Sequence, residues 1–298
     1  MKIAVTGSHG LVARHLLVEL ELGGHEVVRL VRTPAGRGEL RWDPPAGVLD
    51  AAALGGVDAV VHLAGAGLAS RRWNDTIRRA ILDSRVQGTR LLAERLAAMA
   101  KPPEVLVSAS AIGIYGDRGD EVLTETSSSG AGFLAEVCQR WEDAAAPAQS
   151  AGVRTVFLRT GIVQAGDGGA LKAMLPLFRL GLGARLGSGA QWNSWVSMND
   201  EVGAVVHALS AVDLSGPVNV VAPGPVTNSE YTATLARVLG RPAVLSVPAA
   251  VLEAMLGRQM AREVLLASQR VRPAALEASG YRFRHPGLEG ALRAALGQ

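Results

Sequence analysis

The sequence contains one cysteine, Cys138, among 298 residues. A lone thiol excludes an internal disulfide framework and a cysteine-based zinc site. The 6 histidines show no metal-ligand spacing, so we expect no bound metal. No apolar run reaches the ~18 residues of a membrane span, and no hydrophobic leader of signal-peptide length opens the chain. These absences predict a cytoplasmic protein with no membrane partner.

Lysine is also scarce: Lys2, Lys101 and Lys172 are the only examples, so arginine carries most of the positive charge. The 30 basic residues exceed the 27 acidic ones by only 3, which is too weak an excess to indicate a nucleic-acid partner. Aromatic residues make up 4% and apolar residues 48% of the chain. This composition indicates an ordinary globular protein, and its arginines favour small anionic ligands.

Short apolar runs alternate with helical periodicity along the first 160 residues. We expect strands at residues 2–5, 26–31, 58–63, 105–108 and 153–158, and helices at 11–22, 73–99 and 133–146. A further buried strand is expected at 218–221. This alternation predicts an α/β fold with a doubly wound parallel sheet, covered by helices on both faces.

A glycine-rich turn, Thr6-Gly7-Ser8-His9-Gly10-Leu11-Val12-Ala13, joins the first strand to the first helix. Gly7 permits the tight turn, and Gly10 lets the backbone approach a pyrophosphate at the helix N-terminus. Ala13 takes the third small position of this dinucleotide fingerprint. We infer a Rossmann-type cofactor site; a purely structural turn is the alternative. The predicted cofactor-binding residues here are Gly7, Ser8, His9, Gly10, Leu11 and Val12.

The end of the second strand distinguishes NAD from NADP. It carries no carboxylate that could accept a hydrogen bond from a ribose 2′-hydroxyl. Instead Arg32 lies about 20 residues beyond the turn, followed by Thr33, and its guanidinium suits a 2′-phosphate. We therefore expect NADP as the cofactor; a solvated arginine at a strand end is the alternative.

Several blocks resemble the extended short-chain dehydrogenase/reductases, the superfamily of nucleotide-sugar epimerases and dehydratases. These blocks are residues 6–10, 62–67, 107–111, 115–117 and 158–163. A closer similarity is to an atypical subgroup called epimerase family proteins. It is carried by Arg41-Trp42-Asp43-Pro44 and residues 81–89 and 191–195, and by residues 269–273 and 280–283, which look like that subgroup's short C-terminal domain of unknown function.

The resemblance assigns roles to three strand ends. It implies that the first of these ends lies along the ribose and pyrophosphate of the cofactor, the second beneath the nicotinamide, and the third beside the nicotinamide. A plain small-residue strand exit is the alternative for the first. The first strand end consists of Leu63, Ala64, Gly65 and Ala66. The second consists of Ser108 and Ser110, and the third of Thr160, Gly161 and Ile162.

The proton relay typical of these reductases is missing. It uses a Tyr with a Lys four residues later on one helix face. Here the corresponding helix puts Phe133 or Leu134 at the Tyr position, and Val137 or Cys138 at the Lys position. Neither pair can transfer a proton in that way. We interpret Cys138 as a buried packing thiol.

Ser110 and Tyr115 are the remaining catalytic candidates. The Ser110 hydroxyl could hold a substrate oxygen, and Tyr115 could act as the acid if its loop turns inward; packing roles are the alternatives. Arg85 replaces an asparagine common in the superfamily. It could bind a substrate anion or a cofactor phosphate, or pair with Asp83 or Glu94.

Trp192 and Trp195 could form the floor of a substrate pocket, or simply pack between lobes. We expect residues 1–165 to form the NADP-binding domain, with residues from about 195 to 225 returning to it. Residues 166–298 form a smaller substrate lobe, including the subgroup-specific segment from about 245 to 298.

Three functions remain open from the sequence. The first is an NADP(H)-dependent oxidoreductase or epimerase-like enzyme acting on a small carbonyl, alcohol or nucleotide-sugar-like substrate. The second is a non-catalytic NADP(H)-binding sensor or regulatory protein. The third is a nucleotide-sugar binder without redox turnover. Family resemblance also suggests a homodimer formed through the helices that start near Trp73 and Phe133.

Overall fold

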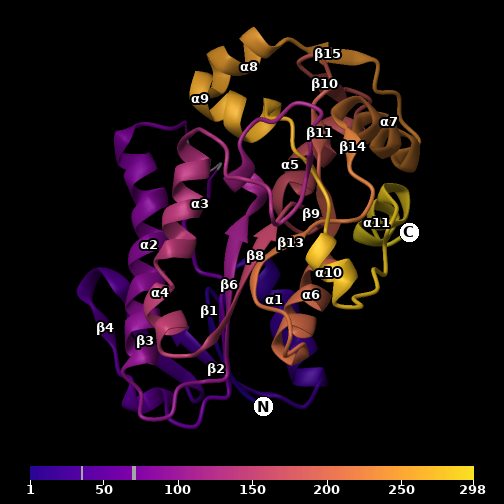
Figure 1. The fold of residues 1–298 in the computed structure, drawn as a ribbon. Helices are drawn as coiled ribbons and strands as arrows, with labels where there is room; N and C mark the ends of the chain where they lie inside the picture. The colour runs from indigo at the N-terminus through magenta and orange to yellow at the C-terminus, as the bar shows by residue number, and fades with distance from the viewer. Residues whose placement is uncertain (35, 69–71) are drawn as a thin grey trace.

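The computed structural model describes residues 1–34, 36–68 and 72–298. Its centre is an eight-stranded sheet of order β13-β8-β6-β5-β1-β2-β3-β4 (Figure 1). Neighbouring strands are parallel except for β3 and β4. The strand order reverses direction at β1, so a crevice forms beyond the carboxyl ends of β1 and β5. The strands are β1 (Lys2–Thr6), β2 (Glu26–Val31), β3 (Glu39–Asp43), β4 (Val48–Leu49), β5 (Ala59–His62), β6 (Val105–Ala111), β8 (Arg154–Thr160) and β13 (Gly216–Val220).

Alternate side chains of the buried strands pack into two separate hydrophobic cores, one on each face of the sheet. Ile3 and Val5 of β1 pack on the face covered by α1 (Leu11–Leu22) and α6 (Met198–Ser210). Ala4 lies in the core on the opposite face, beneath α2 (Asp75–Ala97) and α4 (Ala146–Ser150). Figure 1 shows α3 (Phe133–Asp143) beside α2 on that face. The predicted doubly wound α/β fold is therefore confirmed.

A smaller set of elements extends beyond the carboxyl edge of the sheet. It has its own core, which includes Leu171, Trp195, Tyr231 and Leu292. Its helices are α5 (Gly169–Arg179), α7 (Asn228–Leu239), α8 (Ala249–Leu256), α9 (Arg258–Met260), the π-helix η4 (Ala261–Leu266) and α11 (Leu288–Ala295); α10 (Ala274–Ala278) packs near β13.

Four pairs of short strands lie outside the central sheet. The pairs are β7 (Val122–Leu123) with β16 (Arg270–Val271), β9 (Ile162–Gln164) with β12 (Trp195–Ser197), β10 (Ala184–Leu186) with β15 (Leu245–Val247), and β11 (Trp192–Asn193) with β14 (Val226–Thr227). The 3-10 turns are η1 (Pro44–Ala46), η2 (Ala52–Leu54) and η3 (Ile112–Tyr115). Within the described ranges, no helix is both long enough and apolar enough to cross a bilayer.

Two local expectations differ from the structure. The helix expected from 133 to 146 ends at Asp143, and α4 restarts with Pro147 in its first turn, where a missing N–H is tolerated. Strand β4, at one edge of the sheet, and its neighbour β3 were not expected from the sequence. In β3 only Leu40 and Trp42 are apolar, and a single alternation over five residues is too short to stand out.

Candidate functional site

The glycine turn joins β1 to α1 against the end of β5. Gly7 has φ +67°, and a Cβ there would lie 2.8 Å from backbone atoms of Leu63 and Ala64. Only glycine allows this approach without displacing the neighbouring strand exit. Helix α1 begins after Gly10 with no side-chain cap and no acidic residue in its first turn. Its first N–H groups and helix dipole therefore form a site for an anion.

A cavity of about 880 Å³ opens at this point, and we call it the switch-point cleft. Ten of the predicted cofactor residues line it, and they directly follow the carboxyl ends of β1, β2 and β5. These are Gly7, Ser8, His9, Gly10, Arg32, Thr33, Leu63, Ala64, Gly65 and Ala66. The other predicted cofactor residues do not line it: Leu11, Val12, Arg85, Ser108, Thr160, Gly161 and Ile162. Leu11 and Val12 instead contribute side chains to the packing under α1.

Sequence reasoning missed a second wall of the cleft. The missed residues are Leu30, Val31, Trp42, Pro44, Pro45, Ala80, Asp83, Ser84 and Gln87. Most of them belong to two blocks that carried the family resemblance, residues 41–44 and 81–89. Those two blocks could have indicated that these residues belong to the site. They are far from the glycine turn in the sequence, so the sequence does not show that they line the same cleft. Ser84 Oγ accepts a hydrogen bond from the Ala66 N–H at 3.0 Å, which links α2 to the β5 exit.

Two buried polar atoms in the cleft lack a partner within the described structure: Ser8 Oγ and Trp42 Nε1. Buried hydrogen-bonding groups are normally satisfied, so these two donors are available to a ligand or to water in the cleft. Together with the uncapped N-terminus of α1, they fit a nucleotide that carries phosphate groups. The structure thus supports a dinucleotide in the switch-point cleft by its own chemistry.

A buried polar chain fixes the strand exit that lines the cleft. Thr6 Oγ1 accepts hydrogen bonds from the N–H groups of Leu63 and Ala64, at 3.1 and 3.3 Å. Its own proton is therefore donated to His62 Nδ1 at 2.7 Å, and Nε2–H of His62 donates to Thr89 Oγ1 at 2.9 Å. Burial lowers the pKa of His62 to about 4, so the ring is neutral at physiological pH.

Arg32 lies at the mouth of the cleft, where β2 ends. Its side chain is exposed, and it forms no ion pair or hydrogen bond with the described residues. No carboxylate stands beside it on β2, since Thr33 follows. A free guanidinium at this strand end can bind an additional phosphate group.

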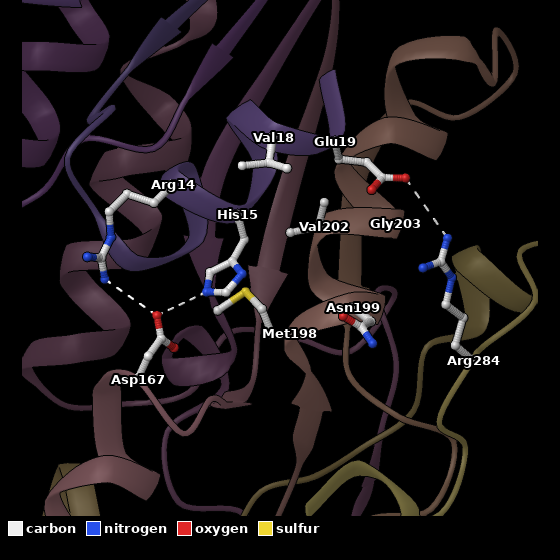
Figure 2. Close-up of a pocket in the computed structure, with 10 residues that line it drawn as sticks. All are labelled: Arg14, His15, Val18, Glu19, Asp167, Met198, Asn199, Val202, Gly203 and Arg284. Carbon is white, nitrogen blue, oxygen red and sulfur yellow. Dashed lines mark hydrogen bonds and ion pairs between the residues drawn. The ribbon is translucent and has the colours of Figure 1, made fainter. Parts of the chain in front are cut away.

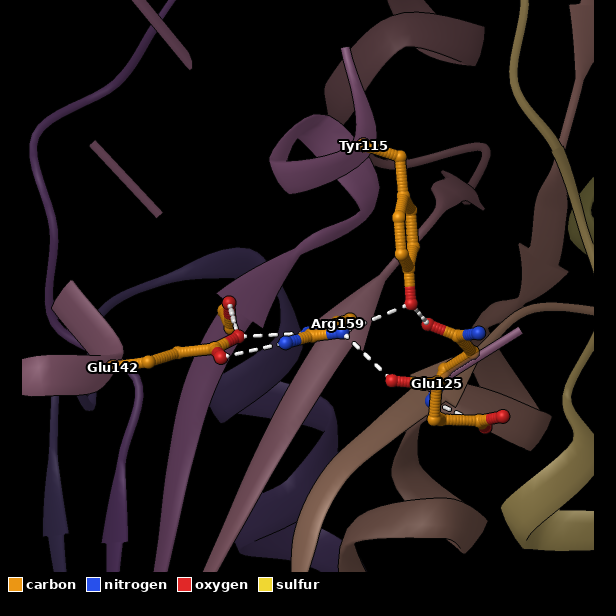
Figure 3. Close-up of polar contacts among 6 residues, drawn as sticks. Tyr115, Glu125, Glu142 and Arg159 are labelled. Atoms are coloured by element: carbon orange, nitrogen blue, oxygen red, sulfur yellow. Dashed lines mark hydrogen bonds and ion pairs between the residues drawn. The ribbon is translucent and has the colours of Figure 1, made fainter. Parts of the chain in front are cut away.

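Ser110 and Tyr115 belong to a buried polar network (Figure 3). Ser110 is 4% exposed and donates to Glu142 Oε1 at 2.7 Å. Arg159 binds the same carboxylate through Nε and Nη2, at 2.9 and 2.8 Å. Tyr115 is fully buried, donates to Asn219 at 2.7 Å and accepts from Arg159 at 3.0 Å.

The hydroxyl of Tyr115 is enclosed and both of its hydrogen bonds are used, which favours the packing alternative, and its acid role stays a prediction. Burial also raises its pKa, although Arg159 opposes the shift. Ser110 likewise has its proton committed to Glu142, and its side chain supports the contact between α3 and β6. The sequence could not show this, since the partners Arg159 and Asn219 come from strands β8 and β13.

Helix α3 shows what stands in place of the usual proton relay. Leu134 is close to Gly113, and Cys138 is 3% exposed beneath it. Burial, reinforced by Glu142, raises the pKa of the Cys138 thiol to about 12. The thiol is a packing group, and neither residue offers a proton to a ligand.

The two tryptophans make packing and polar contacts within the described structure. Trp195 is fully buried in the core of the smaller lobe, where its Nε1 donates to the carbonyl of Gly224 at 3.0 Å. Trp192 donates to Asp120 at 2.8 Å, and the Arg270 guanidinium lies 4.4 Å from its ring centre. Neither residue lines one of these four cavities, and these contacts favour the packing alternative; the substrate-pocket role of both stays a prediction.

Ser108 and Thr160 also point away from the cleft. Ser108 is fully buried. Thr160 donates to Glu201 Oε1 at 2.9 Å. Glu201 is 2% exposed, and burial raises its pKa to about 8. The role of these strand ends beside the nicotinamide stays a prediction.

A second cavity, of about 430 Å³, lies between the start of α3 and the C-terminal segment. Gly113 and Leu134 form one wall, and Glu253, Glu263 and Gln269 contribute to the other. Both oxygens of Glu263 accept backbone N–H groups of the first turn of α3, at 3.1 and 2.8 Å. The C-terminal segment therefore caps the helix that carries Leu134.

A third cavity, of about 380 Å³, lies between α1 and α6 (Figure 2). At its edge Asp167 accepts from His15 at 3.2 Å and pairs with Arg14 at 3.7 Å. Gly168 contacts Leu11, so the loop that carries Asp167 packs against the first residue of α1. These contacts hold α1 in place, and the N-terminus of α1 lies at the switch-point cleft.

The chain matches the NAD dependent epimerase/dehydratase family over residues 3–222. It belongs to this family. A domain of unknown function (DUF1731) matches residues 247–295, the segment that closes the 430 Å³ cavity. The epimerase family protein Mb2239 of Mycobacterium bovis is 45% identical over 284 residues, covering 95% of this chain and 93% of the relative.

Solved structures of this epimerase family share the whole fold. The crystal structure of human epimerase family protein SDR39U1 with NADPH has a TM-score of 0.92 at 35% identity, covering 100% of both chains. The structure of a nucleoside-diphosphate sugar epimerase from Corynebacterium glutamicum has a TM-score of 0.82 at 41% identity, covering 100% of this chain and 58% of that one. The predicted family resemblance is confirmed.

Proposed function

We propose that this member of the epimerase/dehydratase family is an NADP(H)-dependent oxidoreductase for a small carbonyl or alcohol substrate. The observation that carries the proposal is the free guanidinium of Arg32 at the mouth of the switch-point cleft, where an NAD site would place a carboxylate. The human relative with NADPH, similar over the full length of this chain, supports the same cofactor.

Each part of the cleft has a role in holding this cofactor. The N–H groups at the start of α1 and the free Ser8 hydroxyl would bind the pyrophosphate. Trp42 and the prolines of η1 would cover the adenosine, and Arg32 would bind the 2′-phosphate. The His62 chain would hold Leu63 and Ala64 in place along the ribose.

When bound, the nicotinamide supplies or accepts a hydride. The chain's part is to orient the substrate beside it, and the 430 Å³ cavity next to Leu134 is of a size typical of small-molecule sites. Glu263 is the ionisable side chain that contacts the start of α3. A small-molecule substrate enclosed by the C-terminal segment follows from this placement.

One observation favours a second function, a non-catalytic NADP(H) sensor. Leu134 and Cys138 replace the relay, and the hydroxyls of Ser110 and Tyr115 are both committed to the Arg159 network. A protein that only reports the cofactor's redox state would need none of these groups to be free. Turnover distinguishes the two functions.

The test is NADPH oxidation by the intact protein, followed by absorbance with aldehydes, quinones and sugar nucleotides. Turnover with any of them supports the enzyme, whereas tight NADPH binding without turnover supports the sensor. Arg32→Asp should weaken NADPH binding at least about tenfold without weakening NADH binding, because a carboxylate here can accept a hydrogen bond from the ribose 2′-hydroxyl. Arg90→Asp, on the exposed side of α2, is the matched control. Equal affinity for the two cofactors in the parent protein would contradict the assignment of Arg32.

The homodimer expected through α2 and α3 is a further proposal. Sedimentation at several protein concentrations tests it, because a dimer dissociates on dilution and a monomer does not change. A single species at the monomer mass throughout would contradict it.

A further inference from the structure

Arg85 of α2 is a half-buried cation without a counterion among the described residues. Its Nη1 donates to the carbonyls of Ala66 and Ile81, at 3.0 and 3.1 Å. Its Cζ lies 4.9 Å from the ring centre of Trp141 and 3.3 Å from the position of a Cβ on Gly65. Neither Asp83 nor Glu94 pairs with it, so the intrahelical ion pairs considered from the sequence do not form.

A cation in such surroundings is energetically unfavourable unless something compensates it. Burial lowers the pKa of Arg85, which reflects the same cost. Two backbone carbonyls and one aromatic face offset only part of the charge. The remaining donors, Nε–H and the Nη2 protons, have no acceptor in the described structure. An anionic ligand would complete this site.

The free donors define the shape of that ligand. Nε and Nη2 form one edge of the planar guanidinium, and two parallel N–H groups on one edge match two oxygens of a carboxylate or phosphate group. The third nitrogen, Nη1, is fixed by its hydrogen bonds to the carbonyls of Ala66 and Ile81. The Trp141 ring lies against the plane of the guanidinium. The side chain is therefore held ready to bind an oxyanion from one direction.

Arg85 lies away from the part of the switch-point cleft that would hold the adenosine of the cofactor. Ala80, Asp83, Ser84 and Gln87 of the same helix line the switch-point cleft, whereas Arg85 does not. It lies instead between Gly65 and the Trp141 ring of α3. That is the boundary between the cofactor cleft and the helix that lacks the proton relay.

We propose that Arg85 binds an oxyanion group of the substrate, a carboxylate or a phosphate, through its Nε–Nη2 edge. The substrate is then an anionic carbonyl or alcohol compound, positioned by a fixed charge. This inference rests on the proposed function for the location of the cofactor, but the anion site itself depends only on Arg85 and its neighbours.

The experiment measures binding of oxalate and of inorganic phosphate by calorimetry, at constant ionic strength and with sodium chloride as the reference salt. Both probes are titrated into the intact protein, with and without saturating NADPH. We expect one of them to bind, and Arg85→Gln to weaken that binding ~10- to 100-fold. The probe that binds identifies the substrate group as a carboxylate or a phosphate.

Two variants make the result specific. Arg90→Gln removes the same charge from the exposed side of α2 and should bind the probe like the parent. Arg85→Lys keeps the charge but loses the two-donor edge, and its affinity should fall between the parent and Arg85→Gln. The Lys variant also provides the comparison if Arg85→Gln fails to fold, in which case parent-like affinity in Arg85→Lys would contradict the two-donor edge.

Other results overturn the proposal. Unchanged probe binding by Arg85→Gln, or no binding of either probe by the parent, removes the anion site. Loss of NADPH binding in Arg85→Gln beyond about threefold would make Arg85 a cofactor ligand instead. If the parent fails to bind NADPH, the proposed function fails, yet Arg85-dependent probe binding to the protein alone would still show the anion site.

Discussion

Replacing Glu201 with glutamine is expected to stabilise the protein much more at pH 8 than at pH 5. The Glu201 carboxyl lies on α6, is 2% exposed, and accepts one hydrogen bond from Thr160 at 2.9 Å. Its second oxygen has no partner in the described structure. Burial raises its pKa from 4.5 to about 8, so the folded protein keeps this group neutral under physiological conditions.

The magnitude follows from the two pKa values. The stability associated with the neutral acid is complete below pH 4.5 and is lost as the pH rises to about 8. Each pH unit in that window lowers the free energy of unfolding by ~1.4 kcal/mol. Between pH 5 and pH 8 the loss is about 3 kcal/mol. Glutamine keeps the acceptor for Thr160 and does not titrate, so Glu201→Gln should not show this loss.

Urea unfolding of both proteins at pH 5 and pH 8 gives the measurement. The stability of Glu201→Gln minus that of the parent should increase by about 3 kcal/mol between the two pH values. Other titrating groups contribute equally to both proteins and cancel in this difference. Glu94→Gln, an exposed position on α2, controls for removing a carboxylate. A difference that does not change with pH would refute the buried neutral acid.

Three further outcomes are expected. Because folding lowers the pKa of His62 from 6.5 to about 4, this group lowers the parent's stability by ~1.4 kcal/mol per pH unit as the pH falls from 6.5 to 4, so the stability of His62→Gln minus that of the parent should rise by that amount per unit in urea unfolding. Gly7→Ala should abolish NADPH binding in calorimetry, because its Cβ would lie 2.8 Å from the β5 exit, whereas Gly24→Ala, with similar φ but no atom within 4 Å, should bind normally. Cys138, with a pKa of about 12, should react with thiol reagents only after unfolding, and rapid labelling of the native protein would contradict its burial.

The parts of the fold that could be predicted depend on local signals. The near-continuous apolar runs of β1, β2 and β5 identify a parallel sheet without further information. The glycine turn similarly identifies its own site, because φ +67° at Gly7 and an uncapped α1 are properties of adjacent residues. The predictions of the parallel sheet and of the glycine-turn site each depend only on the residues of one short segment.

The remaining features depend on partners distant in the sequence. The packing alternative for Tyr115 is favoured only because Arg159 and Asn219, on other strands, take both of its hydrogen bonds. Trp42 lines the cleft because β3 joins the sheet edge, a strand too short to recognise from its pattern. Arg85 could be listed as an anion ligand from the sequence, but its lack of a counterion is a property of the folded chain.

Calorimetric titration of the intact protein with NADPH and with NADH tests the central claim most directly. The account predicts one NADPH bound per chain and at least about tenfold weaker binding of NADH, since Arg32 binds the phosphate that NADH lacks. No heat with either nucleotide would contradict the assignment of the switch-point cleft. Equal heats and affinities would contradict the role of Arg32.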